Sequence, residues 1–108
     1  MLLGFEIDAE ELSRQLASDD PPLLLDVRSL TEHAAGHIPG SRLAPLPTLR
    51  SKLDRLTDWK NRPIVVYCQS GHRSMDAMLV LKEAGFTSLK MLEGGYEAWV
   101  RHQRGHHA

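Results

Sequence analysis

The chain has 108 residues and a mass of 12.1 kDa, enough for one domain with one hydrophobic core and too few for two. Hydrophobic residues make up 42% and charged residues 25%, a composition that argues against collagen-like, disordered and membrane-spanning classes. Thirteen Lys and Arg against fourteen Asp and Glu give a net charge of -1, without the basic excess that binds nucleic acid. We therefore predict one domain over residues 1–108, with neither nucleic acid nor a membrane as a partner.

The beginning of the chain and its cysteine content bear on where the protein works. Acidic side chains appear at Glu6 and Asp8 before any apolar run reaches the length of a signal peptide, so we expect a cytoplasmic protein. Cys68 is the only cysteine, which excludes an intramolecular disulfide and a cysteine-rich metal site. Its thiol is then either a small buried hydrophobic group or a reactive one.

The first third of the chain predicts a helix followed by a buried strand. Asp8 is a good N-cap for a helix over residues 9–17, and the Asp-Asp-Pro-Pro cluster at 19–22 ends it. Residues 23–27, Leu-Leu-Leu-Asp-Val, form a short continuous apolar run. Such a run is typical of a strand buried on both faces, as in parallel sheets.

The middle of the chain predicts two helices around a brief strand. A short helix over residues 31–35 is closed by Gly36, and a turn at 37–40 leads to a strand near Leu43. Residues 48–56 predict an amphipathic helix. Its apolar positions are Leu49, Leu53 and Leu56.

The strongest strand signal is Ile-Val-Val-Tyr at residues 64–67, with Cys68 at its carboxyl end. A polar turn and a helix over residues 74–84 follow. Residues 87–92 predict another short strand and residues 96–101 a final helix. Strands and helices alternate, so we predict an α/β domain with a mainly parallel sheet covered by helices on both faces.

The end of the chain carries several histidines. His102, His106 and His107 could bind a transition metal, but the segment has no rigid geometry that would select one. We favour a short flexible tail from about residue 103 and predict no metal site.

The segment from Cys68 to Ser74, Cys-Gln-Ser-Gly-His-Arg-Ser, carries the chemistry. A short loop between a strand and a helix can turn its backbone N–H groups inward, and the helix aims the positive end of its dipole at the same point. Gly71 provides backbone freedom for the turn, and Arg73 adds a permanent positive charge. These features favour the thiolate of Cys68, a nucleophile at neutral pH.

The charged residues around the loop leave alternatives open. A carboxylate would hold Arg73 in place, and Asp26 is either that partner or the cap of the turn after its own strand. Arg28 either adds to the positive field at the pocket mouth or pairs with Glu32 on the surface, and we favour a structural role. We assign Ser74, Asp26 and Arg28 to the support of the loop.

Ring side chains near the predicted site also allow two interpretations. His72 either contacts an anionic donor or lies in solvent at the tip of the loop. Trp59 and Trp99 either line the pocket or belong to the core and its rim, and we favour the second interpretation.

Four segments resemble, in the right order, the motifs of the rhodanese-homology domain, a family of single-domain sulfurtransferases. They are Leu24 to Arg28 with its Asp-Val-Arg end; Glu32 with Gly-His-Ile-Pro-Gly-Ser at 36–41; Val65 to Ser74; and Gly85, Phe86 with Leu-Glu-Gly-Gly-Tyr at 92–96 and Trp99. The resemblance covers nearly the whole chain. It implies a three-layer rhodanese-like domain with a central sheet of about five short strands, and it suggests that His37 braces its turn.

The resemblance also implies sulfur transfer through a persulfide on Cys68. The thiolate would attack the outer sulfur of thiosulfate or of a persulfide donor, and the bound sulfur would pass to cyanide or to a thiol or protein acceptor. N–H groups of a substrate-binding loop would stabilise the anions, and no metal or organic cofactor is required. That loop comprises Gln69, Ser70, Gly71, His72 and Arg73.

Two functions remain open. The favoured one is a thiosulfate sulfurtransferase, and the alternative is a binding or thiol-sensing module without efficient turnover. A redox sensor usually has a resolving cysteine, and this chain has none. Because Gln69 and Ser70 add no positive charge, we expect a persulfide to be a better donor than dianionic thiosulfate.

Overall fold

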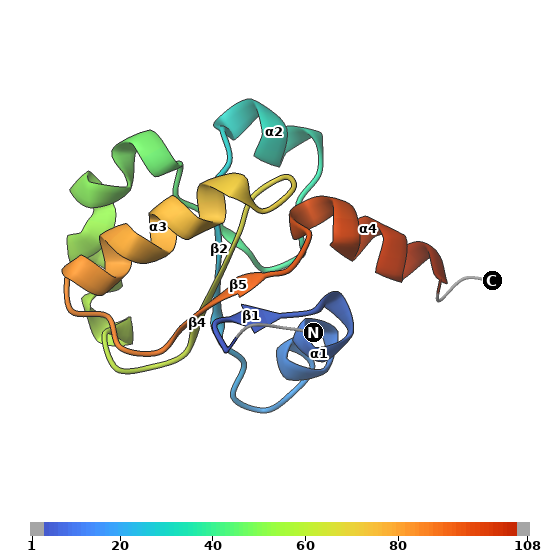
Figure 1. Ribbon diagram of the computed structural model, residues 1–108, viewed down its shortest axis with the longest axis horizontal. Coiled ribbons are helices and arrows are strands. Elements are labelled where there is room, and N and C mark those ends of the chain that lie inside the picture. Colours follow the sequence, from blue (N-terminus) through green and yellow to red (C-terminus); the bar gives the residue numbers. More distant parts are fainter. Residues whose placement is uncertain (1–3, 106–108) are drawn as a thin grey trace.

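A computed structural model describes residues 4–105, and a sheet of five parallel strands forms its centre (Figure 1). The strands lie side by side in the order β1-β5-β4-β2-β3. The predicted α/β architecture with a mainly parallel sheet of about five short strands is therefore confirmed. The strands are β1 (Glu6–Ile7), β2 (Leu23–Asp26), β3 (Arg42–Leu43), β4 (Ile64–Tyr67) and β5 (Leu89–Leu92).

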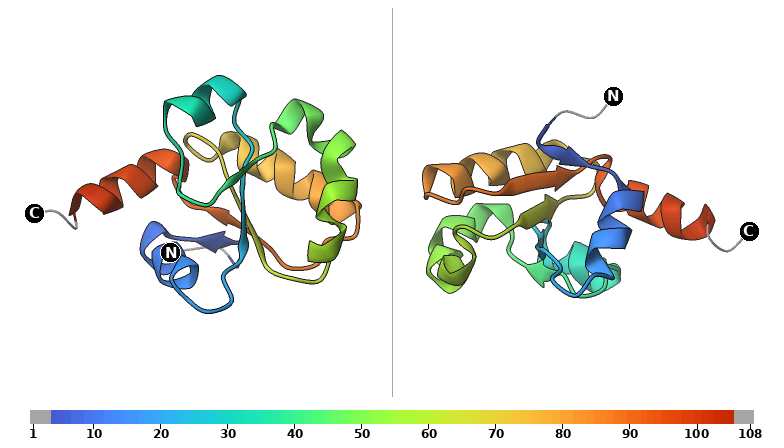
Figure 2. Two further views of the ribbon diagram at one scale, coloured as in Figure 1. Left: turned by 180° about the vertical axis from the view of Figure 1, so that it is seen from behind. Right: turned by 90° about the horizontal axis from the view of Figure 1, so that it is seen from below.

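Helices cover both faces of the sheet (Figures 1 and 2). One face packs against α3 and η1, and the other packs against α1 and α4. Among the described helices, none has the length and apolar character needed to cross a bilayer. The helices are α1 (Ala9–Leu16), α2 (Leu30–Ala35), η1 (Leu46–Trp59), α3 (His72–Glu83) and α4 (Gly95–Gly105).

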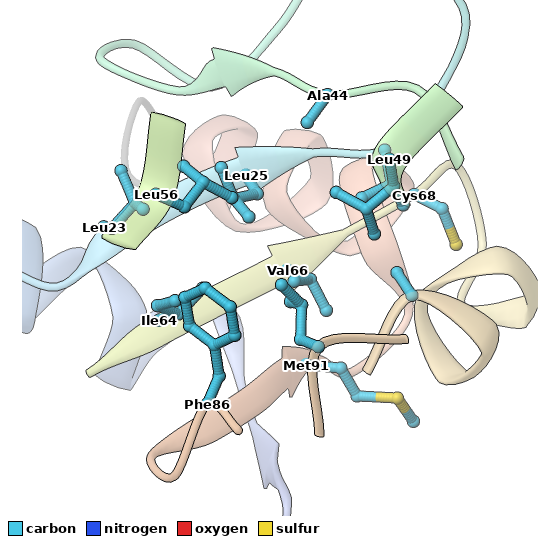
Figure 3. Packing of buried hydrophobic residues seen from close by; sticks show 13 residues of the cluster. Leu23, Leu25, Ala44, Leu49, Leu56, Ile64, Val66, Cys68, Phe86 and Met91 are labelled. Carbon is cyan, nitrogen blue, oxygen red and sulfur yellow. The ribbon is translucent and has the colours of Figure 1, made fainter. Parts of the chain in front are cut away.

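Alternation along the central strands divides the core into two clusters. Successive side chains of a strand point to opposite faces of a sheet. Thus Ile64 and Val66 of β4 belong to the cluster under α3 and η1, while Val65 and Tyr67 belong to the one under α1 and α4. Cys68 continues the first series beyond Val66 (Figure 3). The run at 23–27, predicted as a strand buried on both faces, forms β2, and all four residues of β2 are buried.

Local capping explains where two of the helices begin. The side chain of Asp8 accepts a hydrogen bond from the amide of Glu11 at 2.8 Å, so the predicted N-cap of α1 is confirmed. At α2, Ser29 and Glu32 form a reciprocal capping box, in which each side chain accepts from the backbone N–H of the other. The capping box is a local interaction, so it holds the Glu32 side chain in place without help from tertiary contacts.

Three elements differ from the prediction. The helix expected at 48–56 is a longer 3₁₀-helix, η1, whose turns have three residues where an α-helix has about 3.6. Strand β1 was not located in the sequence, because two residues are too short for an alternating pattern. Helix α4 includes residues 103–105, which we expected in the tail. Residues 106–108 lie outside the described residues.

The start of α4 lies directly against the end of β4. The amides of Tyr96 and Glu97 donate to the carbonyls of Cys68 and Gln69 at 2.8 and 3.2 Å. Gly95 has a φ of +62°, and a Cβ built there would lie 2.5 Å from the Cys68 carbonyl oxygen. Only glycine permits so close a contact, and α4 thereby supports the backbone that carries the thiol.

We expect Gly95→Ala to lower the free energy of unfolding by about 3 kcal/mol, because it combines backbone strain with a clash against fixed carbonyls. Gly40→Ala is the matched control: its φ is +85° and nothing lies within 4 Å of an added Cβ. It should lose about 1 kcal/mol from strain alone. Denaturant unfolding of both variants measures the difference, and equal losses would contradict the close contact.

Candidate active site

Cys68 lies at the carboxyl end of β4, the middle strand of the sheet. Its side chain is buried, with 1% exposed, and it follows Val66 on the face covered by α3 and η1 (Figure 3). Ligands of open parallel sheets bind at the carboxyl ends of the strands. The thiol therefore lies at the carboxyl ends of the strands, as the sequence predicted.

The chain after Cys68 turns tightly into α3. Gly71 has a φ of +117°, and its amide donates a hydrogen bond to Cys68 Sγ at 3.0 Å. It is followed by His72, the first residue of α3, so the positive end of that helix faces the same turn. Donation from the other amides of the loop stays a prediction.

The serines and the histidine of this segment differ in exposure. Ser70 and His72 are exposed, whereas Ser74, in the first turn of α3, is fully buried. A contact between His72 and a bound donor stays a prediction. Among residues 4–105, the Ser74 hydroxyl has no hydrogen-bond partner.

Arg73 pairs with Glu32 and not with Asp26. Its two terminal nitrogens donate to the two carboxylate oxygens of Glu32 at 2.7 and 2.8 Å, a bidentate arrangement. The predicted pairing with Asp26 is wrong, because Arg28, His33 and Tyr67 already occupy that carboxylate. Asp26 and Tyr67 are register partners on adjacent parallel strands, so the segments after both strands leave the same edge. The carboxylate that pairs with Arg73 is therefore expected in the segment after β2, and Glu32 lies in that segment.

The Glu32 and Arg73 charges stabilise one another. Hydrogen bonds from Arg73 lower the pKa of Glu32 to about 2, against a smaller opposing effect of burial. Glu32 in turn raises the pKa of Arg73. The pair joins α2 to the start of α3 across the loop, and about a third of each side chain is exposed.

Asp26 is a fully buried carboxylate. Its Oδ1 accepts from both the backbone amide and the Nε of Arg28 at 3.0 Å, and its Oδ2 accepts from Arg28 Nη2 at 2.8 Å. The contact with the amide two residues on caps the turn after β2, as the second interpretation of Asp26 predicted. Arg28 is itself buried, so the expected surface pair with Glu32 is wrong.

Further donors complete the surroundings of Asp26. His33 Nδ1 and the Tyr67 hydroxyl lie 2.8 and 3.1 Å from its Oδ2. Burial alone would raise the pKa of Asp26, but the hydrogen bonds from Arg28 and His33 outweigh it and the pKa falls below its ordinary value. Burial raises the pKa of Tyr67 to about 12, which keeps the phenol protonated as a donor. Neither His33 nor Tyr67 was identified from the sequence, because each meets Asp26 only in the folded chain.

Arg28 extends this network to the loop. Its Nη1 donates to the Gln69 side-chain oxygen at 3.0 Å, and its Nη2 donates to the Gly36 carbonyl at 2.7 Å. The guanidinium carbon lies 4.5 Å from the ring centre of Tyr96 and 5.4 Å from that of Tyr67. Arg28 therefore holds the first residue after Cys68. This structural role differs from the surface pair with Glu32 that we favoured.

Two hollows border Gln69 beside the loop, with volumes of about 300 and 270 Å³. Gln69 and Tyr96 line both hollows. The first also contains Arg28, Glu32, Ala35 and Gly36, and the second Glu97, Val100, Arg101 and Arg104.

The side chains of His37, Trp59 and Trp99 make structural contacts. His37 Nδ1 donates to the His33 carbonyl at 2.8 Å, and the two rings stack at 3.7 Å. This contact ties the turn to the end of α2. Trp59 and Trp99 are half-buried and pack against the two core clusters, as we favoured.

The histidines of the tail are only partly described. His102 lies within α4, while His106 and His107 fall outside the described residues. Across residues 4–105, no group of three His, Cys, Asp or Glu side chains is arranged to hold a metal ion.

Sequence relatives extend over most of the chain. A protein named sulfurtransferase from Allochromatium vinosum is 38% identical over 97 residues, which cover 90% of this chain and 89% of that protein. A probable adenylyltransferase/sulfurtransferase from Mycobacterium tuberculosis is 35% identical over 98 residues, which cover 91% of this chain. This chain spans only 25% of that second protein.

Solved structures share the fold. A human single-domain sulfurtransferase superimposes with a TM-score of 0.79 at 28% identity, covering 92% of this chain and 97% of its own. A rhodanese-related protein from Thermoplasma volcanium gives 0.78 at 29% identity, covering 90% and 91%. These relatives support sulfur transfer as the general class of activity. The rhodanese-like domain model matches residues 8–102, and the chain belongs to that family.

Proposed function

We propose that this protein is a sulfurtransferase that carries one sulfane sulfur atom as a persulfide on Cys68. Family membership and the sulfurtransferase relatives support the class of reaction. The observation that carries the proposal is the hydrogen bond from the Gly71 amide to Cys68 Sγ, made at the amino end of α3. An amide donor and a helix dipole aimed at a sulfur atom stabilise an anion on that atom.

The loading step transfers sulfur without a net change of charge. The Cys68 thiolate attacks the outer sulfur of the donor, a new S–S bond forms on the enzyme, and the S–S bond of the donor breaks. With thiosulfate, the electron pair of the broken bond leaves with sulfite. With glutathione persulfide, it leaves with the glutathione thiolate. Each reaction converts one anionic sulfur on the protein into another, so the amide donors serve both states.

The discharge step restores the enzyme. A thiophilic nucleophile such as cyanide or a thiolate attacks the outer sulfur of the persulfide, and the electron pair of the broken S–S bond returns to Cys68 as the thiolate. Cyanide becomes thiocyanate and a thiolate becomes a new persulfide. The proposed mechanism requires no metal ion or organic cofactor.

Charge pairing near the loop bears on the choice of donor. Two arginines beside the loop are already paired, Arg73 with Glu32 and Arg28 with Asp26. A paired arginine attracts an additional anion less than a free one does. Thiosulfate carries two negative charges at the transferred sulfur and the group bound to it. Glutathione persulfide carries one there, and its carboxylates lie several bonds away. The second donor is thus better matched to this site.

We expect the purified protein to gain one sulfur atom when it is incubated with glutathione persulfide or thiosulfate, and to lose it when cyanide is added. Intact mass and a thiocyanate assay measure the two steps. Cys68→Ser should neither gain sulfur nor release thiocyanate, because the chain has no other thiol. Failure of the wild type to load from either donor would favour a binding or sensing module instead.

We expect the specificity constant for glutathione persulfide to exceed that for thiosulfate by about tenfold or more, because the paired arginines offer little attraction to a dianion. Steady-state kinetics with cyanide as the common acceptor measure both constants under the same conditions. A specificity constant that is higher for thiosulfate would contradict this assignment of the donor.

The ion pair between Glu32 and Arg73 predicts a pH dependence of stability. The folded-state pKa of Glu32, about 2, lies below its ordinary value of 4.5. The stability from this carboxylate is therefore complete above about pH 4.5 and is lost as the pH falls toward 2. Glu32→Gln keeps a capping-box residue and removes the charge.

We expect Glu32→Gln to be less stable than the wild type by about 1 kcal/mol near pH 7, a value reduced for the partial exposure of both side chains. The difference should shrink between pH 4.5 and 2. Denaturant unfolding of both proteins across this pH range measures the difference in their free energies of unfolding. Asp26 is present in both proteins, so its contribution cancels in that difference. A difference that stays constant down to pH 2 would exclude the ion pair as its source.

A further inference from the structure

Ser74 is the residue whose buried side-chain oxygen has no hydrogen-bond partner within residues 4–105. The residue has 0% of its surface exposed and lies in the first turn of α3, six residues after Cys68. A buried hydroxyl without a partner lowers stability, because it has lost its hydrogen bonds to water. Native structures contain few such groups, and each requires an explanation.

The position of Ser74 on its helix directs it toward the sulfur. The buried residues of α3 are Ser74, Ala77 and Leu81, spaced as one helical face. Ala77 and Leu81 belong to the same core cluster as Cys68, and Ser74 lies one turn closer to the amino end. Since Cα–Cβ bonds tilt toward the amino end of a helix, the hydroxyl is carried toward the turn in which the Gly71 amide meets Cys68 Sγ.

The proposed reaction adds an acceptor at this place. A persulfide adds a second sulfur atom about 2.05 Å from Sγ, the length of an S–S bond, and this atom bears the negative charge. In the unloaded protein the Gly71 amide contacts Sγ, and Arg73 is engaged with Glu32. The Ser74 hydroxyl is a remaining donor, and hydrogen bonds to charged acceptors are the stronger ones.

We infer that the Ser74 hydroxyl is a donor for the outer sulfur of the Cys68 persulfide, unpaired in the unloaded enzyme and paired in the loaded one. This inference rests on the proposed function and adds a residue to it. It implies that the hydroxyl has opposite effects on the two states: it destabilises the free thiolate form and stabilises the sulfur-loaded form. A hydroxyl with a purely structural role would stabilise both.

The test is the equilibrium between the protein and glutathione. Wild type and Ser74→Ala are incubated with glutathione persulfide and glutathione at several fixed ratios, and intact mass gives the loaded fraction. The thiolate of Cys68 and glutathione persulfide exchange for the Cys68 persulfide and the glutathione thiolate, so atoms and charge balance. Ser18→Ala is the matched control, since the Ser18 hydroxyl is exposed and bonds the Gln15 carbonyl at 2.7 Å.

We expect the equilibrium constant for loading to fall about tenfold in Ser74→Ala and to stay unchanged in Ser18→Ala. The unloaded Ser74→Ala protein should unfold at the same denaturant concentration as the wild type or at a higher one, because the variant removes an unpaired buried hydroxyl. Equal loading of Ser74→Ala and the wild type would overturn this inference alone. A wild type that carries no sulfur at any ratio would overturn both the inference and the proposed function.

Discussion

The buried ion pair between Asp26 and Arg28 holds together the segments that follow the two central strands. Asp26 ends β2 beside Tyr67 of β4, so its carboxylate lies at the edge where both chains leave the sheet. A buried charge must be paired and hydrogen-bonded, and Arg28 meets this requirement with contacts to Asp26, to the Gly36 carbonyl and to Gln69. The conformation of the loop after Cys68 therefore depends on a charge pair that lies outside that loop.

In the proposed function, the sulfur anion on Cys68 is stabilised by dipoles more than by free charge. The Gly71 amide and the amino end of α3 face Cys68 Sγ, while Arg28 and Arg73 each have their own carboxylate. Amide dipoles held by the backbone would need no rearrangement when the charge moves from the thiolate to the proposed persulfide. A site of this kind suits a reaction in which the charge shifts by one sulfur atom and does not change in amount.

The fold holds this arrangement rigid from both faces of the sheet. The Cys68 side chain packs within the core cluster under α3 and η1. On the backbone side, the Tyr96 amide of α4 donates a hydrogen bond to the Cys68 carbonyl. The close approach at Gly95 leaves no room for a Cβ. The buried thiol of Cys68 thus has its backbone held by α4 and its sulfur bonded by the Gly71 amide.

Apart from β1, the sequence by itself determined the succession of strands and helices along the chain. It also determined the cap at Asp8 and the place of Cys68 after a buried strand, because these depend on residues close together in the chain. Only the tertiary structure decided which carboxylate meets which arginine. Arg73 and Glu32 are 41 residues apart, as are Tyr67 and Asp26, and these contacts follow from the order and register of the strands. Local patterns carry no information about that register. Two carboxylates such as Asp26 and Glu32 have the same charge and a similar reach, so the sequence could not show which of them pairs with Arg73.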